Sequence, residues 1–97
     1  MLDRAQRFPL ATPFRYRTLG ETGWKAGVTV NLSRSGVLFA AEDPVCPGMA
    51  IEMWFTLPAG AQVVGSGFVV RADDAIEPPR LAARFHHYTM ARSSAPD

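Results

Sequence analysis

The residues best suited to binding in this sequence lie in the short motif Asn31-x-Ser33-x-x-Gly36. The Asn31 amide and the Ser33 hydroxyl each donate and accept hydrogen bonds. Glycine permits positive φ and close approach of a backbone or ligand. Apolar runs precede and follow the motif, at residues 28–32 and 36–40, so the motif is expected to connect two consecutive strands. A ligand is therefore expected at this junction.

The first third of the chain is basic although the net charge is only +1. Residues 1–36 contain six basic residues (Lys or Arg) and two acidic residues (Asp or Glu). Residues 37–97 contain four basic and seven acidic residues. Local positive charge suits an anionic partner that is small or locally contacted. It does not suit long duplex DNA, which usually requires a basic face over a whole domain. Ordinary surface charge is the alternative interpretation.

The segments that position the motif are expected to be short strands. Alternation of apolar and polar side chains predicts six of them, at residues 14–18, 24–32, 36–41, 51–57, 63–71 and 81–85. Gly65 and Gly67 predict a bulge or sharp bend in the fifth. No convincing amphipathic helix is present, so an all-β, six-stranded antiparallel barrel or sandwich is expected.

The strand at residues 24–32 decides which side chains face outwards. Alternation places the apolar side chains on the core side of the strand, namely Val28, Val30 and Leu32. The polar side chains of Thr29, Asn31 and Ser33 fall on the outer side. Asn31 and Ser33 are therefore expected to point together, away from the core.

Ninety-seven residues with 47% hydrophobic content make one domain with a packed interior. We expect an N-terminal arginine-bearing arm at 1–12, the barrel at 13–88 and a flexible C-terminal tail at 89–97, with room for one helical turn after residue 85. Cys46 is the only cysteine, so no internal disulfide forms. Without a signal-peptide core or an apolar run of about 20 residues, we expect a cytoplasmic protein that does not insert into membranes.

Catalysis and metal binding are not predicted. No nucleophile–base or carboxylate pair appears, and Cys46 has no catalytic partner in the sequence. His86 and His87 are adjacent, so on a strand they point to opposite faces and suit a shared metal poorly. Trp54 either lies exposed as a contact surface or helps to close the core, and the pattern leaves both open.

The arm, the Asn31-x-Ser33-x-x-Gly36 motif and the β-rich remainder, over roughly residues 4–88, resemble the PilZ domain family. Val69-Val70-Arg71 late in the chain also looks like the family. The resemblance implies a six-stranded β-barrel, a fold with which many members bind the bacterial second messenger cyclic di-GMP. The family signature pairs R-x-x-x-R in the arm with D/N-x-S-x-x-G between the second and third strands.

The second part of that signature is intact here and the first part is not. Arg7 stands where the second arginine of the pair is expected, but Asp3 occupies the position four residues earlier, and the nearest basic residue is Arg4. Arg80 and Arg84 also have R-x-x-x-R spacing. Because they flank the last predicted strand, we interpret that spacing as chance.

The resemblance implies seven ligand-contacting residues: Arg7 with Arg4 as its displaced companion in a clamp, Asn31, Ser33 and Gly36 as a platform, and Arg34 and Arg71 at the periphery. Arginine suits this role because its planar fork binds phosphate or a guanine edge bidentately and its face stacks on purines. By resemblance, the arm would order over the ligand and signal to an unidentified protein partner. Without a ligand, Asn31 and Ser33 would simply bond the turn backbone.

Two other functions fit the residues. The first is a PilZ-like interaction module that has lost nucleotide binding because its arginine pair is degenerate. The second is a single-stranded nucleic-acid binder on an OB- or cold-shock-like barrel, using Phe14, Tyr16 and the interleaved arginines. The acidic remainder of the chain argues against the second, so no nucleic-acid polymer is expected as a partner.

Overall fold

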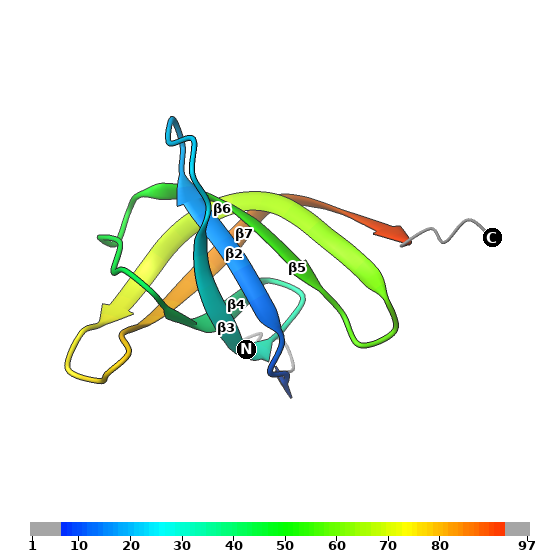
Figure 1. The fold of residues 1–97 in the computed structure, drawn as a ribbon, viewed down its shortest axis with the longest axis horizontal. Coiled ribbons are helices and arrows are strands. Elements are labelled where there is room, and N and C mark those ends of the chain that lie inside the picture. The colour runs from blue at the N-terminus through cyan, green and yellow to red at the C-terminus, as the bar shows by residue number, and fades with distance from the viewer. Residues whose placement is uncertain (1–6, 93–97) are drawn as a thin grey trace, which may run out of the picture.

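The computed structural model describes residues 7–92, which form seven strands and contain no helix (Figure 1). The strands are β1 (Phe8–Pro9), β2 (Pro13–Thr18), β3 (Lys25–Leu32), β4 (Gly36–Ala41), β5 (Ala50–Thr56), β6 (Ala61–Asp73) and β7 (Arg80–Arg92). Six of them correspond to the predicted strands. The additional strand, β1, is a two-residue segment of the arm.

All strand pairs are antiparallel and six of the strands close into a barrel. Their order is β1-β3-β2-β5-β6-β7-β4, and a further pairing of β3 with β4 closes the ring. β1 lies outside the ring and pairs with the end of β3, where Phe8 is opposite Leu32. The predicted all-β, six-stranded antiparallel barrel is therefore confirmed.

Aromatic side chains from three strands fill the barrel. The Phe14 ring lies 4.2 Å from Phe39 and 5.4 Å from Phe55, measured between centroids, and Tyr16 lies 5.2 Å from Phe39. All four are buried. Each buried aromatic ring removes roughly 150–250 Å² from water, so these rings dominate the core. The alternation predicted for residues 14–18 and 51–57 holds, because their inward residues are the buried ones.

The facing predicted for β3 is wrong in its first half. Val28 is 48% exposed whereas Thr29 is only 2% exposed. The pairing of β3 with β4 shifts register between Thr29 and Asn31, so one extra residue is accommodated there. A bulge of this kind reverses which side chains face the core. After it, Leu32 packs against the core as predicted, but Ser33, predicted to point outwards with Asn31, is only 8% exposed.

The end of the chain also differs from the prediction. Residues 89–92 continue β7 instead of starting a tail, and they pair with the first residues of β6. Figure 1 shows this end of β7 extending beyond the barrel. An irregularity does lie beside Gly65 and Gly67, but the extra residue there is His86 of β7, because Ser66 is opposite His87 and Gly67 is opposite Phe85; the extra residue of β6 is Val70. A Cβ on Gly67 would lie far under 3.0 Å from the Arg84 carbonyl oxygen, so glycine lets the two strands approach.

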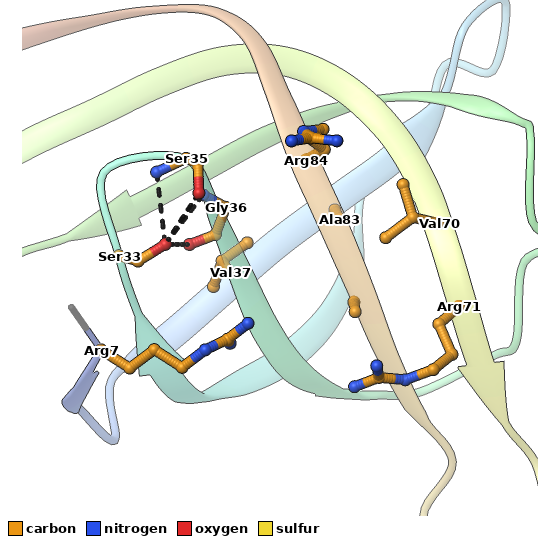
Figure 2. A pocket seen from close by; sticks show the side chains of 10 residues that line it. Arg7, Ser33, Ser35, Gly36, Val37, Val70, Arg71, Ala83 and Arg84 are labelled. Carbon is orange, nitrogen blue, oxygen red and sulfur yellow. Dashed lines mark hydrogen bonds between the residues drawn. The ribbon is translucent and has the colours of Figure 1, made fainter. Parts of the chain in front are cut away.

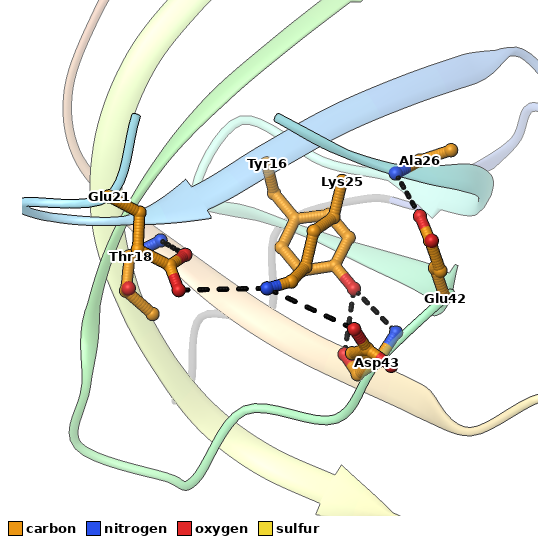
Figure 3. A network of polar contacts seen from close by, with 7 residues as sticks. All are labelled: Tyr16, Thr18, Glu21, Lys25, Ala26, Glu42 and Asp43. Atoms are coloured by element: carbon orange, nitrogen blue, oxygen red, sulfur yellow. Dashed lines mark hydrogen bonds and ion pairs between the residues drawn. The ribbon is translucent and has the colours of Figure 1, made fainter. Parts of the chain in front are cut away.

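Tyr16 fastens the loop after β4 to the core (Figure 3). Its hydroxyl donates to the Asp43 carbonyl oxygen at 2.7 Å and accepts from the Asp43 amide at 2.8 Å. Glu42 accepts from the Ala26 amide at 2.8 Å, and Lys25 lies between Glu21 and Asp43. Burial raises the pKa of Tyr16 above its ordinary value, because the ionised phenolate is poorly solvated inside a barrel.

Tyr16→Phe is expected to destabilise the fold by about 1–3 kcal/mol, because the buried Tyr16 side chain loses both of its part-buried hydrogen bonds with the Asp43 backbone. The raised pKa of Tyr16 adds a pH dependence: its stabilisation is complete below the unfolded pKa near 10 and is lost as the pH rises through the folded pKa. Removing the phenol should therefore make the alkaline loss of stability shallower. Urea unfolding at pH 7 to 11 measures both effects.

The exposed Tyr88 of β7 is the matched control. Tyr88→Phe should change the free energy of unfolding by less than about 0.5 kcal/mol. Equal losses for the two variants would show that the Asp43 contacts of Tyr16 contribute nothing specific.

Candidate ligand-binding site

A pocket of about 210 Å³ lies where the arm, the β3–β4 turn and the outer side of β6 and β7 meet (Figure 2). Its polar lining comes from Arg7, Ser33, Ser35, Gly36, Arg71 and Arg84. The remaining lining residues are small or aliphatic and include Val70. Segments distant in sequence thus contribute to one concave site, as small-molecule sites require.

Ser33 organises the turn at residues 33–36. Its amide donates to the Gly36 carbonyl at 2.9 Å, and its hydroxyl oxygen accepts from the amides of Ser35 and Gly36 at 3.2 Å each. The side chain is only 8% exposed. This is the serine-turn geometry expected from the residue type, so Ser33 shapes the pocket wall. The exposed hydroxyl of the pocket-lining Ser35 is better placed for a ligand.

Gly36 allows close contact between β4 and β7. Gly36 does not use the positive φ that glycine permits, because positive φ among residues 7–92 occurs at Gly20, Gly48 and Gly60. Instead, a Cβ on Gly36 would lie well under 3.0 Å from the Ala83 carbonyl oxygen. The expected close backbone approach is therefore present, and the neighbouring backbone is that of β7.

The described part of the arm is attached to β3 by backbone hydrogen bonds. The Leu10 amide donates to Val30 at 3.1 Å, and the Thr29 amide donates to Thr12 at 3.0 Å. At the start of this segment, the Arg7 guanidinium donates to the Asn31 side-chain oxygen at 3.1 Å. Asn31 therefore contacts the pocket through Arg7 and orients it.

The buried Thr29 hydroxyl strengthens this attachment. It donates to the Leu10 carbonyl and accepts from the Thr12 amide at 2.9 Å. The bulge that turns Thr29 inwards thus also places its hydroxyl beneath the arm. Thr29 is a positioning residue for Arg7 that the sequence did not indicate.

Thr29→Val is expected to loosen the arm, because the Leu10 carbonyl and Thr12 amide both lose a buried partner. The loss should be about 1–3 kcal/mol of stability and faster hydrogen exchange of the Leu10 amide. Thr89→Val on the exposed face of β7 is the control and should change neither. Unchanged exchange at Leu10 in Thr29→Val would contradict a positioning role.

Three guanidinium groups give the pocket its charge. Arg7 and Arg71 point toward one another from opposite sides in Figure 2, and Arg84 comes from β7. Among residues 7–92, no carboxylate lines the pocket. Within residues 7–92, none of these three arginines forms an ion pair, whereas Arg17 and Lys25 do. Uncompensated guanidiniums over a concave surface favour a phosphate-bearing ligand.

A family model of the PilZ domain matches residues 2–94 of the chain. The chain belongs to the PilZ domain family. PilZ domains are binding and adaptor modules and include receptors for cyclic di-GMP. No curated protein matches the chain in sequence.

A solved structure shows the same fold. The Bacillus subtilis inhibitor of motility (MotI/DgrA) superimposes with a TM-score of 0.73 at 14% identity, over 92% of this chain. This PilZ domain spans 44% of the length of that protein. In residues 7–92, no helix is long and apolar enough to cross a membrane.

The structure brings together four of the seven residues implied by the resemblance to PilZ domains: Arg7, Ser33, Gly36 and Arg71 line the pocket. Asn31 joins them through its hydrogen bond with Arg7. Arg34 is exposed in the turn and is not part of the lining. Arg4 lies outside the described residues.

Sequence reasoning missed two polar residues of the pocket, Ser35 and Arg84. Ser35 stands inside the PilZ motif at a position without a prescribed type. The signal for Arg84 was its R-x-x-x-R spacing from Arg80. Of these two arginines, only Arg84 lines the pocket, and Arg80 is not part of the lining.

A second group of large side chains lies on the outer face of β2 and β5. Trp24 meets Trp54 edge-on at 6.0 Å between ring centroids. The Arg17 guanidinium lies 4.3 Å from the Trp24 ring centre, and that of Arg15 lies 5.6 Å from Trp54. Trp54 is therefore a half-buried residue of the outer face, where cation–π contacts order it, and it does not close the core.

Proposed function

We propose that this PilZ domain is a receptor for cyclic di-GMP in the bacterial cytoplasm that conveys ligand binding to a protein partner. The observation that carries the proposal is one pocket lined by Arg7 from the arm, the 33–36 turn and Arg71 from β6, with no carboxylate from the described part of the chain. A phosphate-bearing nucleotide is the ligand class that this charge and shape suit.

The chemistry of the lining matches the parts of the ligand. Guanidinium forks from Arg7 and Arg71 form bidentate hydrogen bonds with phosphate or with guanine O6 and N7. The Ser35 hydroxyl adds a further donor. Val70 exposes an apolar side chain at the edge of the pocket, which suits the face of a base.

The pairing of the arm with β3 affects the conformational entropy that ligand binding costs. The described residues of the arm pair with β3, so in this part of the arm ligand binding would redirect the Arg7 side chain from Asn31 to the ligand without ordering the backbone anew. Fixing one backbone residue costs roughly 1–2 kcal/mol. Residues 8–12 of the arm are already paired with β3 and do not incur that cost again, which favours binding despite the degenerate arginine pair.

Calorimetric titration with cyclic di-GMP tests the proposal. We expect saturable heat with a dissociation constant in the micromolar range and a weaker response at higher salt, because the contacts are charge-assisted. Cyclic GMP, which lacks the second phosphate and base, is the control and should bind more weakly. No heat at high micromolar cyclic di-GMP would overturn the receptor assignment.

A protein-interaction module is the second candidate, and the Trp24–Trp54 face favours it. Tryptophan and arginine are enriched at interface hot spots, and this face combines two of each. If interaction without ligand is the function, Trp54→Ala should abolish activity in cells whereas Arg7→Ala should leave it intact. The receptor assignment expects Arg7→Ala to abolish it while the fold persists.

A further inference from the structure

We propose that Arg84 on β7 supplies the second guanidinium that the arm lacks at position 3, so that the ligand is clamped between the arm and the barrel wall. The inference rests on the proposed receptor function and assigns a specificity-determining residue to it. Its basis is the register of β7 against β4 and β6, together with the charge of the pocket.

Strand register places Arg84 beside the turn that carries the PilZ motif. Arg84 is the cross-strand partner of Gly36 on β4 and of Phe68 on β6. Because Gly36 has no side chain, nothing from that position stands between Arg84 and the 33–36 turn. Arg84 is exposed and lines the same pocket as Arg7.

The charges around Arg84 leave its guanidinium available. Its two cross-strand partners are uncharged, and within residues 7–92 it takes part in no ion pair. Arg80, four residues earlier on the same strand, lies opposite Asp73 and outside the pocket lining. The two arginines share residue type, strand and exposure, so Arg80 is a matched control for Arg84.

The surroundings of Arg84 also favour a base beside the phosphate. Phe68 and Val70 project from the outer face of β6 and are roughly half exposed. The Phe68 ring lies edge-on to His86, with 6.1 Å between centroids. A purine edge bound by the Arg84 fork would lie next to these apolar side chains, and an arginine fork prefers guanine among the bases.

In this arrangement Arg84 on the barrel contributes to ligand affinity in place of the arginine that the arm lacks at position 3. Arg7 and Arg84 reach the pocket from opposite elements, one from the arm before β1 and one from the barrel. Losing either should release one side of the ligand.

Calorimetric titration of the full chain with cyclic di-GMP tests the inference. We expect Arg84→Ala to weaken affinity about 10- to 100-fold, the loss of charge-assisted hydrogen bonds. Arg84→Lys should recover only part of it, because lysine has no bidentate fork. Arg80→Ala should stay within about threefold of the wild type, and melting temperatures should show that each variant is folded.

The outcomes separate the inference from the function on which it rests. A loss of cyclic di-GMP affinity in Arg84→Ala but not in Arg80→Ala supports a clamp formed by the arm and Arg84. Wild-type affinity in folded Arg84→Ala overturns it and leaves the receptor function standing. Equal losses with Arg84→Ala and Arg80→Ala also overturn it, because general charge would then explain the effect. A wild-type chain that binds no cyclic di-GMP overturns both.

Discussion

Arg7→Ala is expected to weaken cyclic di-GMP binding about 10- to 150-fold without lowering thermal stability. A charge-assisted hydrogen bond is worth roughly 1.5–3 kcal/mol, which corresponds to that range of affinity. Arg7 is exposed, and its side-chain hydrogen bond to a described residue is with Asn31. The fold therefore does not depend on it. Calorimetric titration and a melting curve on the same preparation measure the two quantities.

Arg34→Ala is the matched control for Arg7→Ala. Arg34 is also exposed and also basic, but it lies outside the pocket lining. We expect less than a threefold loss of affinity, although the family resemblance implied a peripheral contact. Equal losses in the two variants would mean that overall charge drives binding and would remove the specific role of Arg7.

The second large effect is expected for Gly36→Ala, which should destabilise the barrel by about 3 kcal/mol or more. The new Cβ would collide with the Ala83 carbonyl oxygen, which is backbone and cannot rotate away. Overpacking usually costs about 1–3 kcal/mol, a large share of the 5–15 kcal/mol that stabilises a domain. Thermal unfolding should show a drop of roughly 10–20 °C, and ligand affinity should fall because β4 and β7 both line the pocket.

Gly23→Ala shows whether this effect belongs to the position or to the substitution. Gly23 has no atom within 4 Å of its would-be Cβ and no positive φ. Its replacement should be neutral within about 0.5 kcal/mol. If Gly36→Ala proves as stable as Gly23→Ala, strand proximity is not the reason for glycine in this turn.

The fold could be predicted because local patterns determine much of it. Strict alternation at residues 14–18 and 51–57 puts Phe14, Tyr16 and Phe55 inside the barrel, as the structure confirms. The glycines of β6 correctly marked an irregular stretch of the β6–β7 pairing, although the extra residue beside them lies on β7. The bulge in β3 escaped prediction, because no glycine marks it and an inserted residue leaves the alternation of types unchanged.

The end of β7 shows a different limit. Residues 86–92 carry no clear alternation, and they form a strand because β6 is long enough to pair with them. Such pairing is a long-range property. A single segment read by itself gives no sign of it, so residues 89–92 were assigned to a tail.

Only the part of the candidate site that a local motif marks could be predicted from the sequence. Residues 31–36 carry a contiguous motif, and one residue of the arm, Arg7, stands at the expected distance from it. Arg84 is 48 positions further along the chain than Gly36, and only the β4–β7 register makes them neighbours. The role of Thr29 likewise depends on the β3 bulge that turns it inwards.

Residue-resolved NMR titration of the labelled chain with cyclic di-GMP tests the central claim most directly. We predict saturable shifts for the amides of Ser35, Gly36, Arg71 and Arg84, and little change for the indole N–H signals of Trp24 and Trp54 on the other face. Shifts concentrated at the two tryptophans, or no shifts at high micromolar ligand, would contradict the claim that this pocket binds cyclic di-GMP.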